Sequence, residues 1–182
     1  VRRKAITAAG RLCAQKDYPT MLRAFARVHA RHPDFVLEIY GGGEDRDALV
    51  RLAADLSLAG AVQFKGAVPD AVLQVASSSC YVMSSTYEGM PNALMEALAV
   101  GTPSVSTDCP FGPAELIRDG ENGLLVPVGD DAALADAVCR VIEDPAFAAR
   151  LGDAAKAILA EQSMERISQK YLDYILHIAQ TK

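Results

Sequence analysis

One stretch of the chain joins a predicted strand to a helix and carries two carboxylates: Ser84-Ser-Thr-Tyr-Glu88-Gly-Met-Pro-Asn92-Ala-Leu-Met-Glu96-Ala-Leu-Ala-Val-Gly-Thr-Pro103. Pro91 suits the first position of the helix, where a missing backbone N–H costs nothing. The N–H groups from Gly89 to Asn92 should then lie unpaired at the helix start, which favours anion binding. Glu96 falls between apolar neighbours, so we expect its carboxylate to need a hydroxyl or a cation as partner. The stretch therefore predicts phosphate-binding amides between two hydroxyl acceptors, a combination that suits a nucleotide sugar.

Short apolar runs alternate with longer amphipathic segments along the chain. Strands are predicted over 5–9, 35–40, 62–64, 81–84, 104–106 and 123–126. Helices are predicted over 17–30, 45–56, 70–77, 91–99, 113–118, 130–143, 146–159 and 164–179. This alternation predicts an α/β fold with a parallel sheet covered by helices on both faces. Ligands of such sheets bind at the carboxyl ends of the strands, so we expect five loops to share that edge: Gly10-Arg11, the Gly41 loop, 66–70, 85–92 and 107–112.

Composition limits the classes of function. The 182 residues are half apolar (51%) and 23% charged, which suits one sizeable domain over residues 1–182. A net charge of −5, with no basic stripe or aromatic platform, argues against a nucleic-acid partner. The pattern holds no membrane-spanning stretch or signal peptide, which predicts a cytoplasmic protein.

The cysteines and histidines show no pattern of chemistry. The four cysteines are scattered and include no CxxC pair, so we expect reduced thiols with mostly structural roles. His29 and His32 lie near a predicted helix end, where solvated or capping roles are expected. The chain begins with Val1 and enters a strand pattern at once, which predicts a piece of a longer protein.

Two cations precede the second predicted element. Arg11 follows the first predicted strand, and Lys16 comes just before a helix, so both should lie at the ligand edge and hold a diphosphate. The alternative for each is a solvated surface side chain.

Three further patterns resemble sites of known chemistry: a glycine run, an Asp-x-Asp pair and the pair of glutamates. Gly41-Gly42-Gly43 does not match the G-x-G-x-x-G motif of dinucleotide binding, because Arg46 occupies the position of the third glycine. The run instead predicts a turn that a ligand or a neighbouring loop approaches closely. Asp45-Arg46-Asp47 has the Asp-x-Asp form of some metal sites, but acidic residues also favour helix starts, and the capping interpretation is preferred. Glu88 and Glu96 do not suit a glycosidase pair, because a helical carboxylate among apolar neighbours fits hydroxyl binding better than proton transfer.

Taken together, the motifs resemble a known family. They are Gly10-Arg11-Leu12 with Lys16, Tyr40-Gly-Gly-Gly, Phe64-x-Gly66-x-Val68, the two-glutamate stretch, and Asn122-Gly-Leu-Leu-Val126. In this order they resemble the C-terminal half of a retaining GT-B glycosyltransferase of family 4, also called glycosyltransferases group 1. The resemblance covers almost the whole chain and implies a Rossmann-like donor-binding domain.

The resemblance implies a role for each motif residue. Arg11 and Lys16 would hold the donor diphosphate, Glu96 would accept from the ribose hydroxyls, and Glu88 would contact the transferred sugar. The backbone of Gly89, Met90, Pro91 and Asn92 would assist Glu88, and Val68 and Asp70 would lie near the base. No metal or other cofactor is implied. The donor would be a nucleotide sugar with UDP as its nucleotide, and the acceptor would be a glycan or a lipid-linked sugar.

The chain departs from the family pattern at one position, and the resemblance covers only one of the family's two domains. Many members carry Gly-Gly near Phe111-Gly112, and the variant in this chain resembles transferases of bacterial surface polysaccharides. The acceptor site of the family belongs to an N-terminal domain that precedes this segment, so we expect this piece to bind donor weakly and to transfer no sugar. The full-length protein could associate with the inner face of the membrane. Two rival functions remain, a non-catalytic nucleotide-binding or assembly module and an epimerase, although the latter would need carboxylates and a histidine that are not found.

Overall fold

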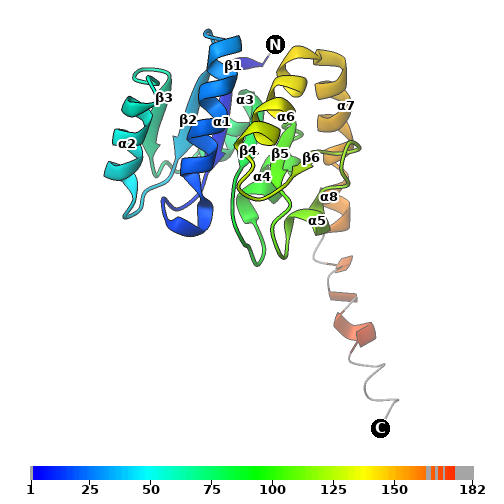
Figure 1. Cartoon of the computed structure of the whole chain (residues 1–182). Helices are drawn as coiled ribbons and strands as arrows, with labels where there is room; N and C mark the ends of the chain where they lie inside the picture. Colours follow the sequence, from blue (N-terminus) through cyan, green and yellow to red (C-terminus); the bar gives the residue numbers. More distant parts are fainter. Residues whose placement is uncertain (1, 163–164, 167, 170, 175–182) are drawn as a thin grey trace.

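Six parallel strands form one sheet in the order β3-β2-β1-β4-β5-β6 (Figure 1). The computed structural model describes residues 2–162, 165–166, 168–169 and 171–174. The strands are β1 (Arg3–Ala9), β2 (Val36–Tyr40), β3 (Val62–Gly66), β4 (Ser78–Met83), β5 (Ser104–Thr107) and β6 (Leu124–Val126). The predicted Rossmann-like α/β fold with a parallel sheet is therefore confirmed.

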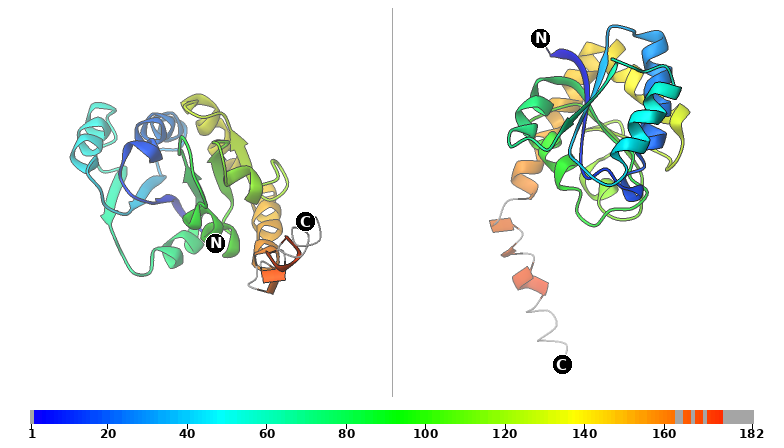
Figure 2. Two further views of the ribbon diagram at one scale, coloured as in Figure 1. Left: turned by 90° about the horizontal axis from the view of Figure 1, so that it is seen from below. Right: turned by 90° about the vertical axis from the view of Figure 1, so that its left-hand side faces the viewer.

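Helices cover both faces of the sheet. They are η1 (Ala14–Lys16), α1 (Tyr18–Arg31), α2 (Arg46–Asp55), α3 (Ala71–Ser77), α4 (Asn92–Ala99), α5 (Pro113–Leu116), α6 (Asp131–Glu143), α7 (Pro145–Ala155) and α8 (Ile158–Glu161). One face carries α1, α2 and α6, and the other carries α3 and α4 with α7 and α8 beside them (Figure 2). None of the helices in the described part of the chain is long and apolar enough to cross a bilayer.

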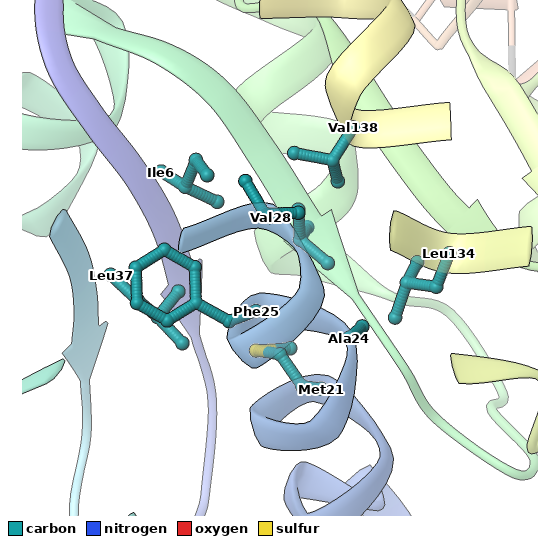
Figure 3. Close-up of a pocket in the computed structure, with 9 residues that line it drawn as sticks. Ile6, Met21, Ala24, Phe25, Val28, Leu37, Leu134 and Val138 are labelled. Atoms are coloured by element: carbon teal, nitrogen blue, oxygen red, sulfur yellow. The ribbon is translucent and has the colours of Figure 1, made fainter. Parts of the chain in front are cut away.

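Each face of the sheet has its own apolar core. The first core joins α1 and α6 to the sheet through side chains such as Leu22, Leu37 and Leu134. The second joins α3, α4 and α8 through side chains such as Val75, Leu98 and Ile158. A residual cavity of about 10 Å³ lies in the first core (Figure 3), with only apolar side chains around it. It is about the size of one water probe, so it is a packing gap and no ligand site.

Aspartates begin several of the helices. The Asp17, Asp130 and Asp144 carboxylates accept hydrogen bonds from the first-turn amides of α1, α6 and α7. Asp45 occupies the N-cap position of α2, as the capping interpretation predicts, but its side chain accepts no such hydrogen bond. Asp45 therefore has the expected position at the helix start but does not make the capping hydrogen bond.

Two predictions about helices were wrong. Pro91 is the N-cap of α4 and not its first helical residue, with φ −79° and ψ 80°. The helix predicted over 146–159 is two helices, α7 and α8, separated by a turn at Lys156 and Ala157. Of the helix predicted over 164–179, residues 165–166, 168–169 and 171–174 are described and helical, and the rest lies outside the described residues.

The strand order places a topological switch point between β1 and β4. From β1 the chain moves outward through β2 and β3, then returns to the other side of β1 at β4. The loops that follow β1 and β4 therefore separate toward opposite faces, which leaves a crevice at the carboxyl edge. The residues of interest gather at this edge.

Candidate functional site

The loops at the carboxyl edge are tied together by backbone hydrogen bonds. Gly10 N donates to Tyr40 O at 2.9 Å, and Gly41 N donates to Gly66 O at 2.8 Å. Thr86 N donates to Gln15 O at 2.9 Å across the switch point. The loops after β1, β2, β3 and β4 thus form one continuous edge, as the parallel sheet predicts.

The glycine run after β2 allows close approach of the β1 loop. A Cβ atom at Gly41 would lie 2.0 Å from Gly10 O, and the φ of Gly41 is +130°. Both space and backbone conformation therefore require glycine there. The run is a turn packed against a neighbouring loop, which was one of the two outcomes predicted for it.

Lys16 and Glu88 form an ion pair at the switch point. Lys16 Nζ lies 2.5 Å from Glu88 Oε1, and the two side chains come from the loops after β1 and β4. Glu88 is only 8% exposed, and a carboxylate this buried needs charged or hydrogen-bonding partners. The structure thus joins two residues that the sequence placed only on the same edge.

Ser85 is a member of the site that the sequence analysis missed. Its Oγ donates to the same Glu88 Oε1 atom at 2.6 Å, and its carbonyl accepts from Thr107 Oγ1 at 2.6 Å. Ser85 is fully buried, so the arrangement is fixed by packing from β5. The only sequence signal was a hydroxyl three residues before Glu88.

The second oxygen of Glu88 remains available. Lys16 Nζ and Ser85 Oγ both contact Oε1. Every buried side-chain oxygen in the described part of the chain has a partner, so Oε2, which has none there, must reach solvent. An acceptor oxygen with fixed direction and no internal partner is suited to a ligand hydroxyl.

Two tyrosines lie beneath this pair and stay neutral. Burial raises the pKa of Tyr18, and the nearby Cys13 and Glu88 add to the rise. Burial also raises the pKa of Tyr81, with smaller contributions from Tyr18, Glu88 and Glu96. Both glutamates of the motif are therefore within electrostatic reach of the Tyr81 hydroxyl.

Glu96 does not have the environment that was predicted. It is exposed on α4, and among the described residues its carboxylate has no hydrogen bond or ion pair. The reason is that α4 buries Leu94, Ala97 and Leu98, which leaves position 96 on the solvent side. The apolar surroundings inferred for Glu96 from its sequence neighbours were wrong, and the hydroxyl partner expected for it stays a prediction about a ligand.

The start of α4 offers fewer free amides than predicted. Pro91 has no N–H, and Asn92 N already donates to Met90 O at 2.9 Å. Within the described residues, the N–H groups of Gly89 and Met90 have no hydrogen-bond partner. The candidate anion site is therefore reduced to these two amides.

Arg11 borders an open pocket beside the switch point. It is exposed and, in the described part of the chain, its side chain has no hydrogen bond or ion pair. The pocket measures about 430 Å³ and is lined by Ala9, Gly10, Arg11, Tyr40, Gly41, Gly42, Ala67, Val68 and Ala71. The structure thus brings Arg11 and Val68 together. Asp70 lies outside the lining, exposed at the N-cap position of α3.

The loop after β5 closes one side of the site. Glu88 N donates to Pro110 O at 3.2 Å. A Cβ atom at Gly112 would lie 2.5 Å from the Pro91 side chain, so glycine is required for this contact. Between them, Phe111 has φ +63° and is 74% exposed. A phenylalanine therefore occupies a left-handed backbone position beside the Glu88 loop.

A doubly wound parallel sheet with charged groups and free amides at its switch point defines a class of α/β proteins that bind nucleotides at this edge. Within that class, the chain belongs to the family Glycosyl transferases group 1, which matches residues 2–158. The resemblance seen in the motifs is confirmed, as is the fold of one half of a GT-B glycosyltransferase.

Three comparisons illustrate the relationship. The chain is 37% identical over 171 residues to the lipopolysaccharide core biosynthesis glycosyltransferase LpsE of Rhizobium meliloti. The matched region is 93% of this chain and 49% of LpsE. It is similar to a mutant of Staphylococcus aureus TarM, solved with UDP, fondaparinux and α-GlcNAc-glycerol, with a TM-score of 0.89 and 25% identity. The match covers 94% of this chain and 35% of the TarM chain. It is also similar to the pneumococcal O-GlcNAc transferase GtfA, solved with UDP and GlcNAc, with a TM-score of 0.84 and 25% identity. This match covers 98% of this chain and 37% of the GtfA chain. The chain therefore spans about half or less of the length of these relatives.

Proposed function

We propose that this chain is the donor-binding domain of a retaining glycosyltransferase. In this proposal a hexosyl or N-acetylhexosaminyl group passes from a UDP-sugar to a glycan or lipid-linked acceptor, in the synthesis of a bacterial surface polysaccharide. The observation that carries it is the buried Lys16–Glu88 pair at the switch point. The name of LpsE and the UDP complexes of TarM and GtfA support the pathway and the nucleotide.

In this scheme, two cationic side chains bind the phosphates of the donor. The Lys16 ammonium has three N–H donors, and one directed to Glu88 leaves two for a diphosphate oxygen. Arg11 borders the adjoining pocket and contributes a second positive charge. Charge on the leaving nucleoside diphosphate grows during transfer, so fixed cations stabilise the transition state more than the ground state. The scheme assigns no metal ion or other cofactor to this step.

The two glutamates divide the rest of the donor. Glu88 Oε2 accepts from a hydroxyl of the transferred sugar, and the amides of Gly89 and Met90 contact the same end of the donor. Glu96 accepts from the ribose hydroxyls, since its exposed carboxylate has no competing partner among the described residues. Val68 packs beside the base in the pocket that it shares with Arg11. Asp70 is exposed next to Ala71 of that pocket and would lie near the base.

The experiment that tests this is calorimetric titration with UDP, GDP and ADP. We expect UDP to bind and Arg11→Ala to weaken it by about tenfold, the loss of one charge-assisted contact. Arg51→Ala, another exposed arginine, is the control and should bind like the parent. Binding of none of the three nucleotides by folded protein would instead favour a non-catalytic assembly module.

We also propose that the chain alone transfers no sugar. A single wall of a cleft neither excludes water nor aligns an acceptor with the donor. Incubation with UDP-glucose or UDP-GlcNAc and a glycan acceptor should give no product above the uncatalysed background. Sustained transfer by this chain alone would contradict the proposal.

A further inference from the structure

A second cluster of functional side chains lies at the opposite end of the domain. Helices α1 and α6 begin at the carboxyl edge and run side by side to the other edge of the sheet (Figure 1). There His32, the C-cap residue of α1, meets Cys139 and Glu143 of the last turn of α6. One ligand atom from each of the three lies within 4.8 Å of the others.

The cluster combines the three ligand types that zinc prefers. Imidazole nitrogen, thiolate sulfur and carboxylate oxygen are its usual protein ligands, at about 2.0–2.3 Å. Cys139 and Glu143 are four residues apart on α6, which places both on one helix face. His32 Nε2 already lies 2.7 Å from Glu143 Oε1. Two ligand atoms of a tetrahedral zinc stand about 3.3 Å apart, so a small opening of this contact would admit the ion.

The Cys139 thiol is buried and has no competing hydrogen bond. Its residue is 1% exposed, and no hydrogen-bond partner for the thiol exists among the described residues. The Cys80 thiol donates to Tyr81 O, whereas the Cys13 thiol, like that of Cys139, has no such partner among the described residues. The missing partner therefore leaves Cys139 available to a metal, and the geometry of the cluster carries the argument. Cys139 is therefore an unpartnered buried sulfur whose available neighbours are an imidazole and a carboxylate.

Access and charge are compatible with a cation. The side chains of His32 and Glu143 are 24% and 42% exposed, so an ion can enter between them to reach the buried sulfur. The C-terminal ends of α1 and α6 both face this region, and helix C-termini favour positive charge. Arg31 competes for Glu143 at 2.8 Å, but it also pairs with Asp136 at 3.3 Å and can keep that partner when a metal binds.

We propose that His32 Nε2, Cys139 Sγ and Glu143 Oε1 bind one zinc-class divalent ion, with solvent as the fourth ligand. On binding, the Cys139 thiol loses its proton to solvent and His32 takes the neutral form with its proton on Nδ1. The His32–Glu143 hydrogen bond is then replaced by two metal bonds. The ion would clamp α1 to α6 at the edge away from the donor. It has no part in sugar transfer, and it departs from the expectation that the chain holds no metal.

The test is a titration of tag-free protein with Co²⁺ in a reductant without thiols. We expect saturation at one equivalent and a near-ultraviolet thiolate-to-cobalt absorption band. Zn²⁺ should then displace Co²⁺ and abolish the band. The band should vanish in Cys139→Ala and persist in the control Cys109→Ala, another buried free thiol. A band that survives Cys139→Ala, or no saturable binding by the parent, would overturn the proposal.

A second variant keeps the test decisive if Cys139→Ala does not fold. His32 is partly exposed, so His32→Gln should fold and lower the zinc affinity at least about tenfold. His29→Gln, one turn earlier on α1, is its matched control and should retain the parent affinity. Equal affinity in the parent and His32→Gln would mean adventitious binding elsewhere and would also overturn the proposal.

Discussion

Lys16 Nζ lies 2.5 Å from Glu88 Oε1, and the two residues come from loops on either side of the topological switch point. The pair satisfies a buried carboxylate and at the same time places an ammonium at the carboxyl edge of the sheet. Structure and proposed chemistry therefore depend on the same contact.

Removing the ammonium should affect both binding and stability. Lys16→Met keeps the length of the side chain but leaves Glu88 buried without its cation. We expect UDP affinity to fall about tenfold and the free energy of unfolding to fall by about 1–3 kcal/mol. Calorimetry and urea denaturation measure the two effects. Lys4→Met removes an exposed lysine that pairs with Asp34, and it should change neither quantity appreciably.

Ser85 should act on the sugar and not on the nucleotide. Ser85→Ala removes the 2.6 Å hydrogen bond that orients Glu88 Oε1. We expect UDP-hexose affinity to fall about fivefold, about 1 kcal/mol, while UDP affinity stays unchanged. Ser104→Ala, a buried serine of β5 whose Oγ donates to Thr102 O, is the control. An equal loss for both ligands would show that Ser85 only supports the loop as a whole.

Much of the fold could be predicted from the sequence because its pattern is strong. All six strands and the parallel sheet follow from apolar runs alternating with amphipathic segments. The start of β4 was missed because Ser78 and Ser79 are polar, and their strand conformation comes from pairing with β1. A tertiary contact of this kind leaves no periodic signal.

The site was predicted less completely for a similar reason. The edge and the residues Arg11, Lys16 and Glu88 followed from position after a strand. Their mutual contacts did not, because Lys16 and Glu88 are 72 residues apart. Glu96 was misjudged because its sequence neighbours are apolar, whereas exposure depends on which face of α4 a position occupies. The His32–Cys139–Glu143 cluster was missed because only the spacing of Cys139 and Glu143 shows in the sequence.

Phe111 should be replaceable by glycine with a gain in stability. Its φ of +63° is unfavourable for a residue with a side chain, by about 1–2 kcal/mol. This exceeds the cost of about 0.5–1 kcal/mol that glycine adds through the freedom of the unfolded chain. Its ring is 74% exposed, so little packing is lost. We therefore expect Phe111→Gly to raise the free energy of unfolding by about 1 kcal/mol in urea denaturation.

Tyr87→Gly is the matched control for Phe111→Gly. Tyr87 is also a large exposed side chain on this edge but does not have a positive φ. Glycine there should lower stability, because it only adds freedom to the unfolded chain. A loss of stability in both variants would show that the backbone at Phe111 is unstrained.

Glu38 should make stability depend on pH. Arg3 donates to its two oxygens at 3.1 and 3.0 Å, and Tyr40 Oη donates at 2.8 Å. Burial acts to raise the pKa of Glu38, but the hydrogen bonds from Arg3 and Tyr40 outweigh it and the pKa is lowered. The folded state therefore binds fewer protons than the unfolded chain, whose glutamate pKa is about 4.3. The stabilisation is complete above that value and is lost as pH falls through the lowered pKa.

Glu38→Gln measures this contribution. We expect a loss of about 1–2 kcal/mol at pH 7, toward the lower end because Arg3 is partly exposed. The difference from the parent should shrink below about pH 4. Glu44→Gln, an exposed glutamate, should match the parent at both pH values. A difference for Glu38→Gln that is the same at pH 7 and at pH 3 would contradict the pKa argument.

In the proposed site, Glu88 binds the sugar of a UDP-sugar and Glu96 binds its ribose. The most direct measurement is calorimetric titration of the parent, Glu88→Gln and Glu96→Gln with UDP and with UDP-hexose. We predict that Glu96→Gln weakens both ligands equally, because both contain the ribose. Glu88→Gln should remove the additional affinity for UDP-hexose and leave UDP unchanged. Parent-like binding of both ligands by both variants would contradict the account.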